Sequence, residues 1–162
     1  AARVDGSGAT VALTEQDRRL WDGTAIAEGL VLIDAALMRQ TPGPYQIKAA
    51  IAACQVSDDA PDWPQIALLY ASLYRIEATP IVRLNRAVAL AESGDLPEAV
   101  EILSHLAPVL DTYQPFHAAL AEFLSRAGRW AESRCAYDRA IAMTNNSADA
   151  AFLIKRAKML PQ

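Results

Sequence analysis

The chain has 162 residues and a net charge of −4, and 52% of its residues are hydrophobic. With only seven glycines and nine prolines, this composition argues against a disordered chain and is sufficient for one domain with a buried core. The acidic balance argues against a nucleic-acid-binding surface spread over the whole chain. No run approaches 18 consecutive apolar residues, so no membrane span is predicted.

Residues 1–13 are expected to form a tail with a turn at Asp5-Gly6-Ser7-Gly8. They contain neither an initiator Met nor the layout of a signal peptide, so we expect the chain to be a piece of a longer protein, with residues 14–162 forming a single domain. Thr14 followed by Asp17 resembles a capping box and predicts that the first helix opens there.

The remainder of the first helix, AIAEGLVLIDAALMRQ, follows a break expected near Gly23. Its apolar residues Ile26, Leu30, Ile33 and Leu37 recur at helical spacing and predict a buried stripe. The turn signal Thr41-Pro42-Gly43-Pro44 ends the helix.

Alanine- and leucine-rich segments then alternate with turn signals, which favours helices over strands. A loop is expected at Asp58-Asp59-Ala60-Pro61-Asp62, and N-caps are expected at Asp62, Thr79 and Asp95. The triplet Asn145-Asn146-Ser147 is expected to cap the last helix. Seven more helices are predicted, over residues 45–56, 63–76, 81–93, 97–106, 116–127, 130–144 and 148–160.

These helices repeat with a period of about 34 residues. The stretches DWPQ and DLPE begin 33 residues apart at Asp62 and Asp95, and the helix-ending residues Gly94 and Gly128 lie 34 apart. A helical hairpin with this period is typical of tetratricopeptide repeats (TPR), in which each hairpin buries its apolar face against the next. The sequence therefore predicts an all-α fold of TPR-like hairpins, about eight helices stacked into a right-handed superhelix.

Equivalent positions of the two repeats agree with this packing. The small residues Ala99 and Ser133 coincide where helices touch closely, and the bulky residues Leu103 and Tyr137 coincide in the second helix of each hairpin.

No residue pattern predicts catalysis or cofactor binding. The two histidines, His105 and His117, have no metal-ligand spacing with cysteine or acid and are expected at the surface or partly packed. Cys54 and Cys135 are expected to be buried free thiols. Phosphate-binding glycine motifs are absent. We therefore expect a protein that is not an enzyme and that needs no cofactor or metal.

The repeat register places several polar side chains on the concave side of the predicted stack, where helical repeats hold a peptide or a neighbouring domain. Taken singly, each of these residues is more often an ordinary solvated side chain of a helix. The predicted interaction surface consists of Lys48, Gln55, Asn85, Val88, Glu92, Glu122 and Arg126.

Four stretches, in order, carry a family resemblance: AARVDGSGATVALTEQDRRLWD, IAEGLVLIDAAL, GPYQIKAAIAAC with DWPQIALLYASL, and PIVRLNRAVALAESGD. Together they resemble the C-terminal extension of one group of extracytoplasmic-function (ECF) RNA polymerase sigma factors, over about residues 2–160. Gln55 and Lys48 depart from the family pattern, which has His and Gln there.

The resemblance implies a cytoplasmic regulatory domain, with polymerase and promoter binding in sigma domains that precede it. It also implies protein partners: the sigma domains of the same chain, core RNA polymerase, or a small YCII-like signalling protein. Direct binding of nucleic acid or membrane by this segment is not expected.

Two other functions remain open from the sequence. One is a generic TPR adaptor for a peptide tail, but a carboxylate clamp needs Lys and Asn where Ile51 and Gln55 stand. The other is a small-molecule sensor with a pocket inside the superhelix, which an enclosed aromatic cavity with a convergent arginine would favour.

Overall fold

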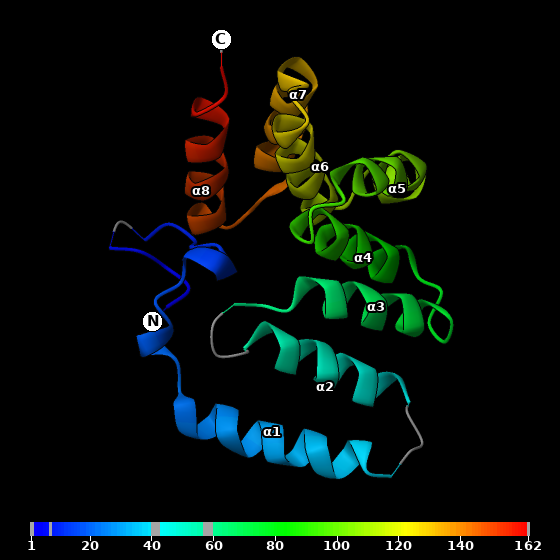
Figure 1. Ribbon diagram of the computed structural model, residues 1–162. Coiled ribbons are helices and arrows are strands. Elements are labelled where there is room, and N and C mark those ends of the chain that lie inside the picture. The colour runs from blue at the N-terminus through cyan, green and yellow to red at the C-terminus, as the bar shows by residue number, and fades with distance from the viewer. Residues whose placement is uncertain (1, 7, 40–42, 57–59, 162) are drawn as a thin grey trace. The chain divides into compact units, whose positions relative to one another are not determined.

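The computed structural model describes residues 2–6, 8–39, 43–56 and 60–161. The described residues form eight α-helices (Figure 1), two short 3₁₀ turns and one isolated antiparallel bridge between Val4 and Thr10, which confirms the all-α, TPR-like prediction. The helices are α1 Gly23–Leu37, α2 Pro44–Gln55, α3 Trp63–Tyr74, α4 Pro80–Glu92, α5 Leu96–Leu110, α6 Gln114–Arg126, α7 Trp130–Met143 and α8 Ser147–Lys158. The predicted turn positions Ser7, Thr41, Pro42, Asp58 and Asp59 lie outside the described residues.

The helices belong to two compact units. One unit, Trp21–Asp95, contains α1 to α4, and consecutive helices pack against each other within it. The other unit joins the N-terminal tail, Ala1–Leu20, to Leu96–Gln162, where α5 to α8 also pack consecutively. That residues 14–162 act as a single domain stays a prediction.

Local signals at the helix starts explain why most boundaries were predictable. The side chains of Asp62, Thr79 and Asn146 each accept a hydrogen bond from a backbone N–H of the first turn, as predicted. Proline in the first turn follows two of these caps, where its missing N–H leaves no helical bond unmade. Gly94 and Gly128 adopt φ values of +100° and +74° at the helix ends, a conformation that favours glycine.

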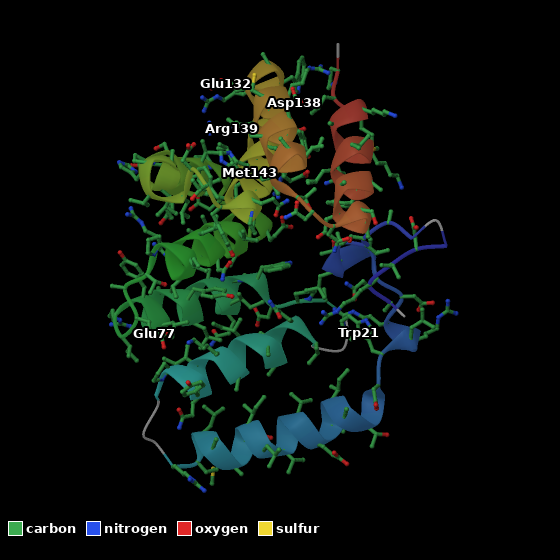
Figure 2. All side chains as sticks on the ribbon, turned by 180° about the vertical axis from the view of Figure 1, so that it is seen from behind. Trp21, Glu77, Glu132, Asp138, Arg139 and Met143 are labelled. Carbon is green, nitrogen blue, oxygen red and sulfur yellow. The ribbon has the colours of Figure 1, made fainter. Side chains whose placement is uncertain are left out.

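The predicted opening of the first helix at Thr14 is wrong. The carboxylate of Asp17 accepts bonds from the backbone and side chain of Arg19 instead of supporting a capping box. Residues near Thr14 therefore form only 3₁₀ turns. Helix α1 begins at Gly23, two residues after Trp21 (Figure 2), because Asp22 caps it by accepting the N–H of Ala25 at 3.0 Å.

The predicted buried stripe of the first helix is also wrong. No residue of α1 is buried, and Leu30 and Leu37 of that stripe are exposed. Ile26 and Ile33 are half-buried on the side that packs on α2. The periodicity identified the side that packs, but one neighbouring helix covers it only in part.

Three further expectations need correction. Helix α5 continues past its predicted end at Leu106 through Pro108 to Leu110. His117 is buried, not at the surface, and its Nε2 lies 2.7 Å from the carbonyl oxygen of Asp111. Cys135 is an exposed free thiol and Cys54 a half-buried one.

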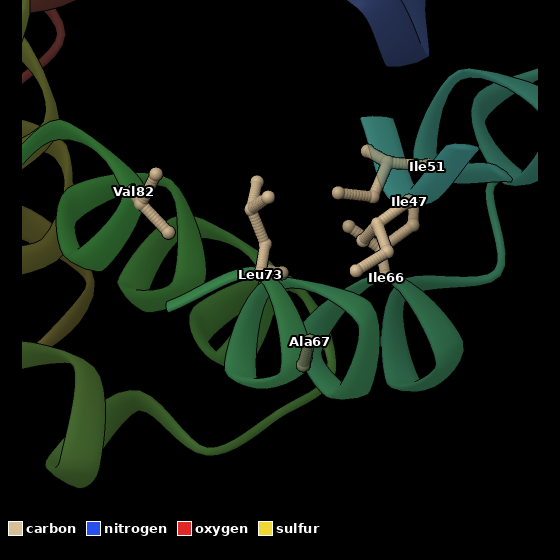
Figure 3. Close-up of a cluster of buried hydrophobic side chains, with 7 residues drawn as sticks. Ile47, Ile51, Ile66, Ala67, Leu73 and Val82 are labelled. Atoms are coloured by element: carbon tan, nitrogen blue, oxygen red, sulfur yellow. The ribbon is translucent and has the colours of Figure 1, made fainter. Parts of the chain in front are cut away.

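Each unit has an apolar core built from its own helices. In the α1–α4 unit, isoleucines of α2 and α3 meet Leu73 and Val82 (Figure 3). In the α5–α8 unit, small residues let α6 and α7 approach closely; Ser133 and Ala121 are fully buried there. The second core consists of Ala121, Leu124, Ala136, Tyr137, Ala140, Leu153 and Leu160.

Candidate interaction groove

A groove of about 350 Å³ opens in the α1–α4 unit. Its walls come from α2, α3, α4 and the connection between α3 and α4, so three helices and one turn position it. We call it the α2–α4 groove; it is lined by Lys48, Ile51, Tyr70, Leu73, Glu77, Thr79, Ile81, Val82 and Asn85.

The floor of the α2–α4 groove is apolar. Ile51, Leu73 and Val82 line it and are buried members of the unit's core (Figure 3). Ile81, in contrast, is 44% exposed at the groove's edge. A ligand entering the groove would therefore replace water over a preformed hydrophobic surface.

One polar pair on the rim joins α2 to the α3–α4 connection. The Nζ atom of Lys48 lies 2.8 Å from Oε2 of Glu77 and 3.0 Å from Oε1, and Glu77 is labelled in Figure 2. Both side chains are substantially exposed, so the ion pair contributes little to stability. It places a donor and an acceptor beside the apolar floor.

The second polar pair joins α3 to α4. Burial raises the pKa of the Tyr70 phenol, and a hydrogen bond with the Asn85 side chain acts in the opposite direction. Tyr70 therefore stays protonated at neutral pH, and its hydrogen bond connects α3 to Asn85 of α4. The groove thus presents polar groups from two separate pairs around an apolar centre.

The structure brings together two residues of the predicted interaction surface, Lys48 and Asn85, which both line the groove. Gln55 and Val88 are half-buried and Glu92 is exposed, and none of these three lines it. Whether they contact a partner stays a prediction.

The remaining two predicted residues, Glu122 and Arg126, belong to the α5–α8 unit. Glu122 accepts hydrogen bonds from the Tyr137 hydroxyl at 2.9 Å and from Arg156 at 2.7 Å. It thereby links α6 to α7 and α8. The exposed guanidinium of Arg126 lies 6.0 Å from the ring centre of Phe123. Glu122 is engaged inside its unit, whereas Arg126 is accessible.

Sequence reasoning missed Tyr70 and Glu77. Tyr70 shares the stripe of Ile66 and Leu73 at positions i+4 and i+7, so the pattern placed it with the core but gave no sign of its bond to Asn85. No spacing relates Glu77 to Lys48, which lies 29 residues earlier on another helix.

The described part of the chain contains neither of two other kinds of site. No three side chains among His, Cys, Asp and Glu in this part of the chain lie close enough to hold a metal ion. No described helix combines the length and the apolar content that crossing a membrane requires.

Comparisons with known proteins agree with the repeat. Residues 80–104, which cover α4 and the start of α5, match the tetratricopeptide repeat family, and residues 1–37 match a family of unknown function (DUF6596). An uncharacterized protein (R00370) of Rhizobium meliloti (strain 1021) is 43% identical over 155 residues, or 94% of this chain. The match covers 37% of that relative, so the chain spans little more than a third of its length. No solved structure matches.

Proposed function

We propose that this chain is the regulatory, protein-binding domain of an ECF-type sigma factor, following the sigma domains that bind polymerase and promoter DNA. The ordered sequence resemblance to that group supports the placement. A TPR-like helical domain is typical of protein interaction, and the longer relative has room for further domains.

The α2–α4 groove is the observation that carries a binding function. An extended segment of a partner can place an apolar side chain on Ile51, Leu73 and Val82 while its backbone meets the polar rim. Lys48 and Glu77 offer a donor and an acceptor, and Asn85 offers both in one side chain. The groove volume of about 350 Å³ is at the lower end for ligand sites, enough for one or two side chains.

The proposed mechanism is binding without catalysis, and it requires no cofactor. The domain shifts the sigma domains between active and inactive arrangements because it binds one arrangement more tightly than the other. Its partner is a segment of the sigma domains, core polymerase, or a YCII-like signalling protein. The acidic chain itself does not bind promoter DNA.

A generic adaptor for peptide tails is the second candidate, since the same groove would serve it. The carboxylate-clamp form is disfavoured because Ile51, where a lysine would be needed, is 4% exposed in the apolar floor. A small-molecule sensor is the third candidate. It is disfavoured because the groove is open and no arginine is among the described residues that line it.

A matched pair of variants tests the groove. Ile81→Glu places a charge at its edge, whereas Ile76→Glu changes a similarly exposed isoleucine, 53% against 44%, that does not line it. Biolayer interferometry measures binding to purified sigma domains, core polymerase and the YCII-like protein. We expect Ile81→Glu to weaken binding by about tenfold or more and Ile76→Glu to leave it unchanged.

The outcomes separate the candidates. Equal binding by the two variants would refute the proposal that partners bind in the α2–α4 groove. Binding to none of the three partners would reject the sigma-factor assignment and leave the adaptor or the sensor. Transcription from the factor's promoter, measured with the same substitutions in the full-length protein, shows whether binding has a regulatory effect.

A further inference from the structure

Helix α1 has an apolar outer face that no other helix of its own unit covers. Its half-buried residues Ile26, Gly29, Ile33 and Ala36 recur at helical spacing on the side toward α2. On the opposite side the side chains are strongly exposed: Val31 is 68% exposed. The line through this outer face is formed by Ala27, Val31, Ala35 and the C-cap residue Met38.

This face differs from what the end of a helical-repeat stack needs. Terminal repeats require a polar outer side for solubility, but Val31, Leu32 and Met38 are 68%, 71% and 83% exposed. Ala27 and Val31 also line a shallow hollow together with Glu28 and Leu32. A contiguous apolar patch of this kind indicates an interaction site.

The charges of α1 indicate the chemistry of the occupant. Glu28 and Asp34 are its only charged residues between Gly23 and Leu37. At 100° per residue they flank Val31 at about 60° on either side. Neither carboxylate forms an ion pair with a described residue. The apolar line is therefore bordered by negative charge on both edges.

We propose that the outer face of α1 binds an amphipathic helix of a partner protein whose apolar stripe is bordered by Lys or Arg on both edges. Basic borders would pair with Glu28 and Asp34, while the stripe covers Val31 and its small neighbours Ala27 and Ala35. A second copy of the chain fits less well, since two α1 faces would bring four carboxylates together. An anionic membrane surface is repelled for the same reason.

This surface lies on a different helix from those that line the α2–α4 groove, and the inference does not depend on the proposed function. The outer face of α1 would therefore be a second protein-binding surface of the chain, separate from the groove.

The test uses the 162-residue chain and two designed peptides of about 20 residues, long enough to form a helix in water. Both carry the same Leu/Ala stripe, bordered by Lys in one peptide and by Glu in the other. Fluorescence anisotropy measures their binding. We expect the Lys-bordered peptide to bind at least tenfold more tightly than the Glu-bordered one.

Two exposed positions supply a matched control for surface charge. Val31→Lys on α1 and Leu68→Lys on α3 add the same charge at similarly exposed sites, 68% and 64%. Val31→Lys should weaken binding of the Lys-bordered peptide by tenfold or more, and Leu68→Lys should change it by less than twofold. Equal weakening by both would mean non-specific attraction and would overturn the proposal.

A charge exchange tests the borders themselves. The double variant Glu28→Lys with Asp34→Lys should prefer the Glu-bordered peptide, with each of its two reversed pairs contributing a change of about two- to fivefold. An unchanged preference would refute the role of the carboxylates. Sedimentation velocity tests whether the wild-type chain dimerises. A dimer that Val31→Lys abolishes would overturn the proposal and identify a second copy of the chain as the occupant of this face. Binding to phosphatidylglycerol vesicles that depends on Val31 would also overturn the proposal and identify a membrane as the occupant.

Discussion

Ser133 shows how closely α6 and α7 pack. Its side chain is fully buried, and its hydroxyl donates a 2.7 Å hydrogen bond to the carbonyl of Ala121 across the helix pair. Ala121 is also fully buried, and Ala136 and Ala140 continue the same small stripe along α7. The space between the two helices at this level therefore accommodates nothing larger than a serine side chain.

Two substitutions at Ser133 separate the contribution of its hydrogen bond from that of the close packing. Ser133→Ala removes the hydroxyl, but the Ala121 carbonyl retains its acceptor role within α6, so no buried group is left unsatisfied. We expect a loss of about 0.5–1 kcal/mol in the free energy of unfolding. Ser133→Leu removes the same bond and also forces extra carbon atoms into a filled contact, and we expect a loss of about 2–4 kcal/mol.

Urea unfolding followed by far-UV circular dichroism measures both changes. Asp138→Leu is the control, since Asp138 lies on the exposed side of the same helix (Figure 2) and tests a leucine there without crowding. It should change stability by about 0.5 kcal/mol or less. A Ser133→Leu variant as stable as Asp138→Leu would refute the tight contact. A larger loss in Ser133→Ala than in Ser133→Leu would show that the hydrogen bond, not the space, governs this position.

Three further predictions concern single residues. Burial and the Glu122 carboxylate raise the pKa of the Tyr137 phenol. The protonated phenol therefore contributes to stability below about pH 10, the pKa of an unfolded tyrosine, and this contribution is lost as the pH rises above it. In alkaline unfolding, Tyr137→Phe should lose stability less steeply than the wild type. Gly128→Ala should destabilise by about 1–2 kcal/mol because φ is +74°. Gly29→Ala should stabilise by about 0.5–1 kcal/mol, since the Cβ that alanine adds inside α1 would meet no other atom within 4 Å; thermal unfolding compares the two. Thr79→Ala removes the N-cap of α4 and should lower the free energy of unfolding by about 1 kcal/mol, with Thr79→Ser as the conservative control in urea.

Helix starts were predictable because their causes are local. A cap such as Asp62 and a proline one or two residues later act within a single turn. The failure at Thr14 has an equally local cause, since the Asp17 carboxylate has a competing partner in Arg19. Where two local interactions compete for one side chain, the spacing alone does not decide between them.

Burial was less predictable, because it depends on which helices are neighbours. The stripe of α1 is as periodic as that of a core helix, yet none of its residues is buried. His117 shows the reverse error: nothing near it in sequence indicates burial, but its Nε2 meets the Asp111 carbonyl oxygen six residues before it.

The candidate groove was half predictable for the same reason. The repeat register placed Lys48 and Asn85 on helices that face one hollow, and both line it. Lys48 pairs with Glu77, which lies in the α3–α4 connection. Asn85 pairs with Tyr70, which lies on α3, and only the packing of the helices determines these two pairings. A polar residue in a repeat can thus be assigned to a face from sequence, whereas its hydrogen-bond partner depends on the fold.

Helix α1 in the first unit and helix α8 in the second differ in how their sides are occupied within their own units. Helix α8 is tied down by polar interactions: Arg156 binds Glu122 of α6, and Thr10 of the tail donates its N–H to the Ala148 carbonyl. Among the described residues, Glu28 and Asp34 on the outer side of α1 have no ion pair, and Val31 is exposed there. An apolar face kept exposed carries a cost in solubility that a polar substitution would remove. The difference between these helices therefore points to α1 as the surface built for another helix.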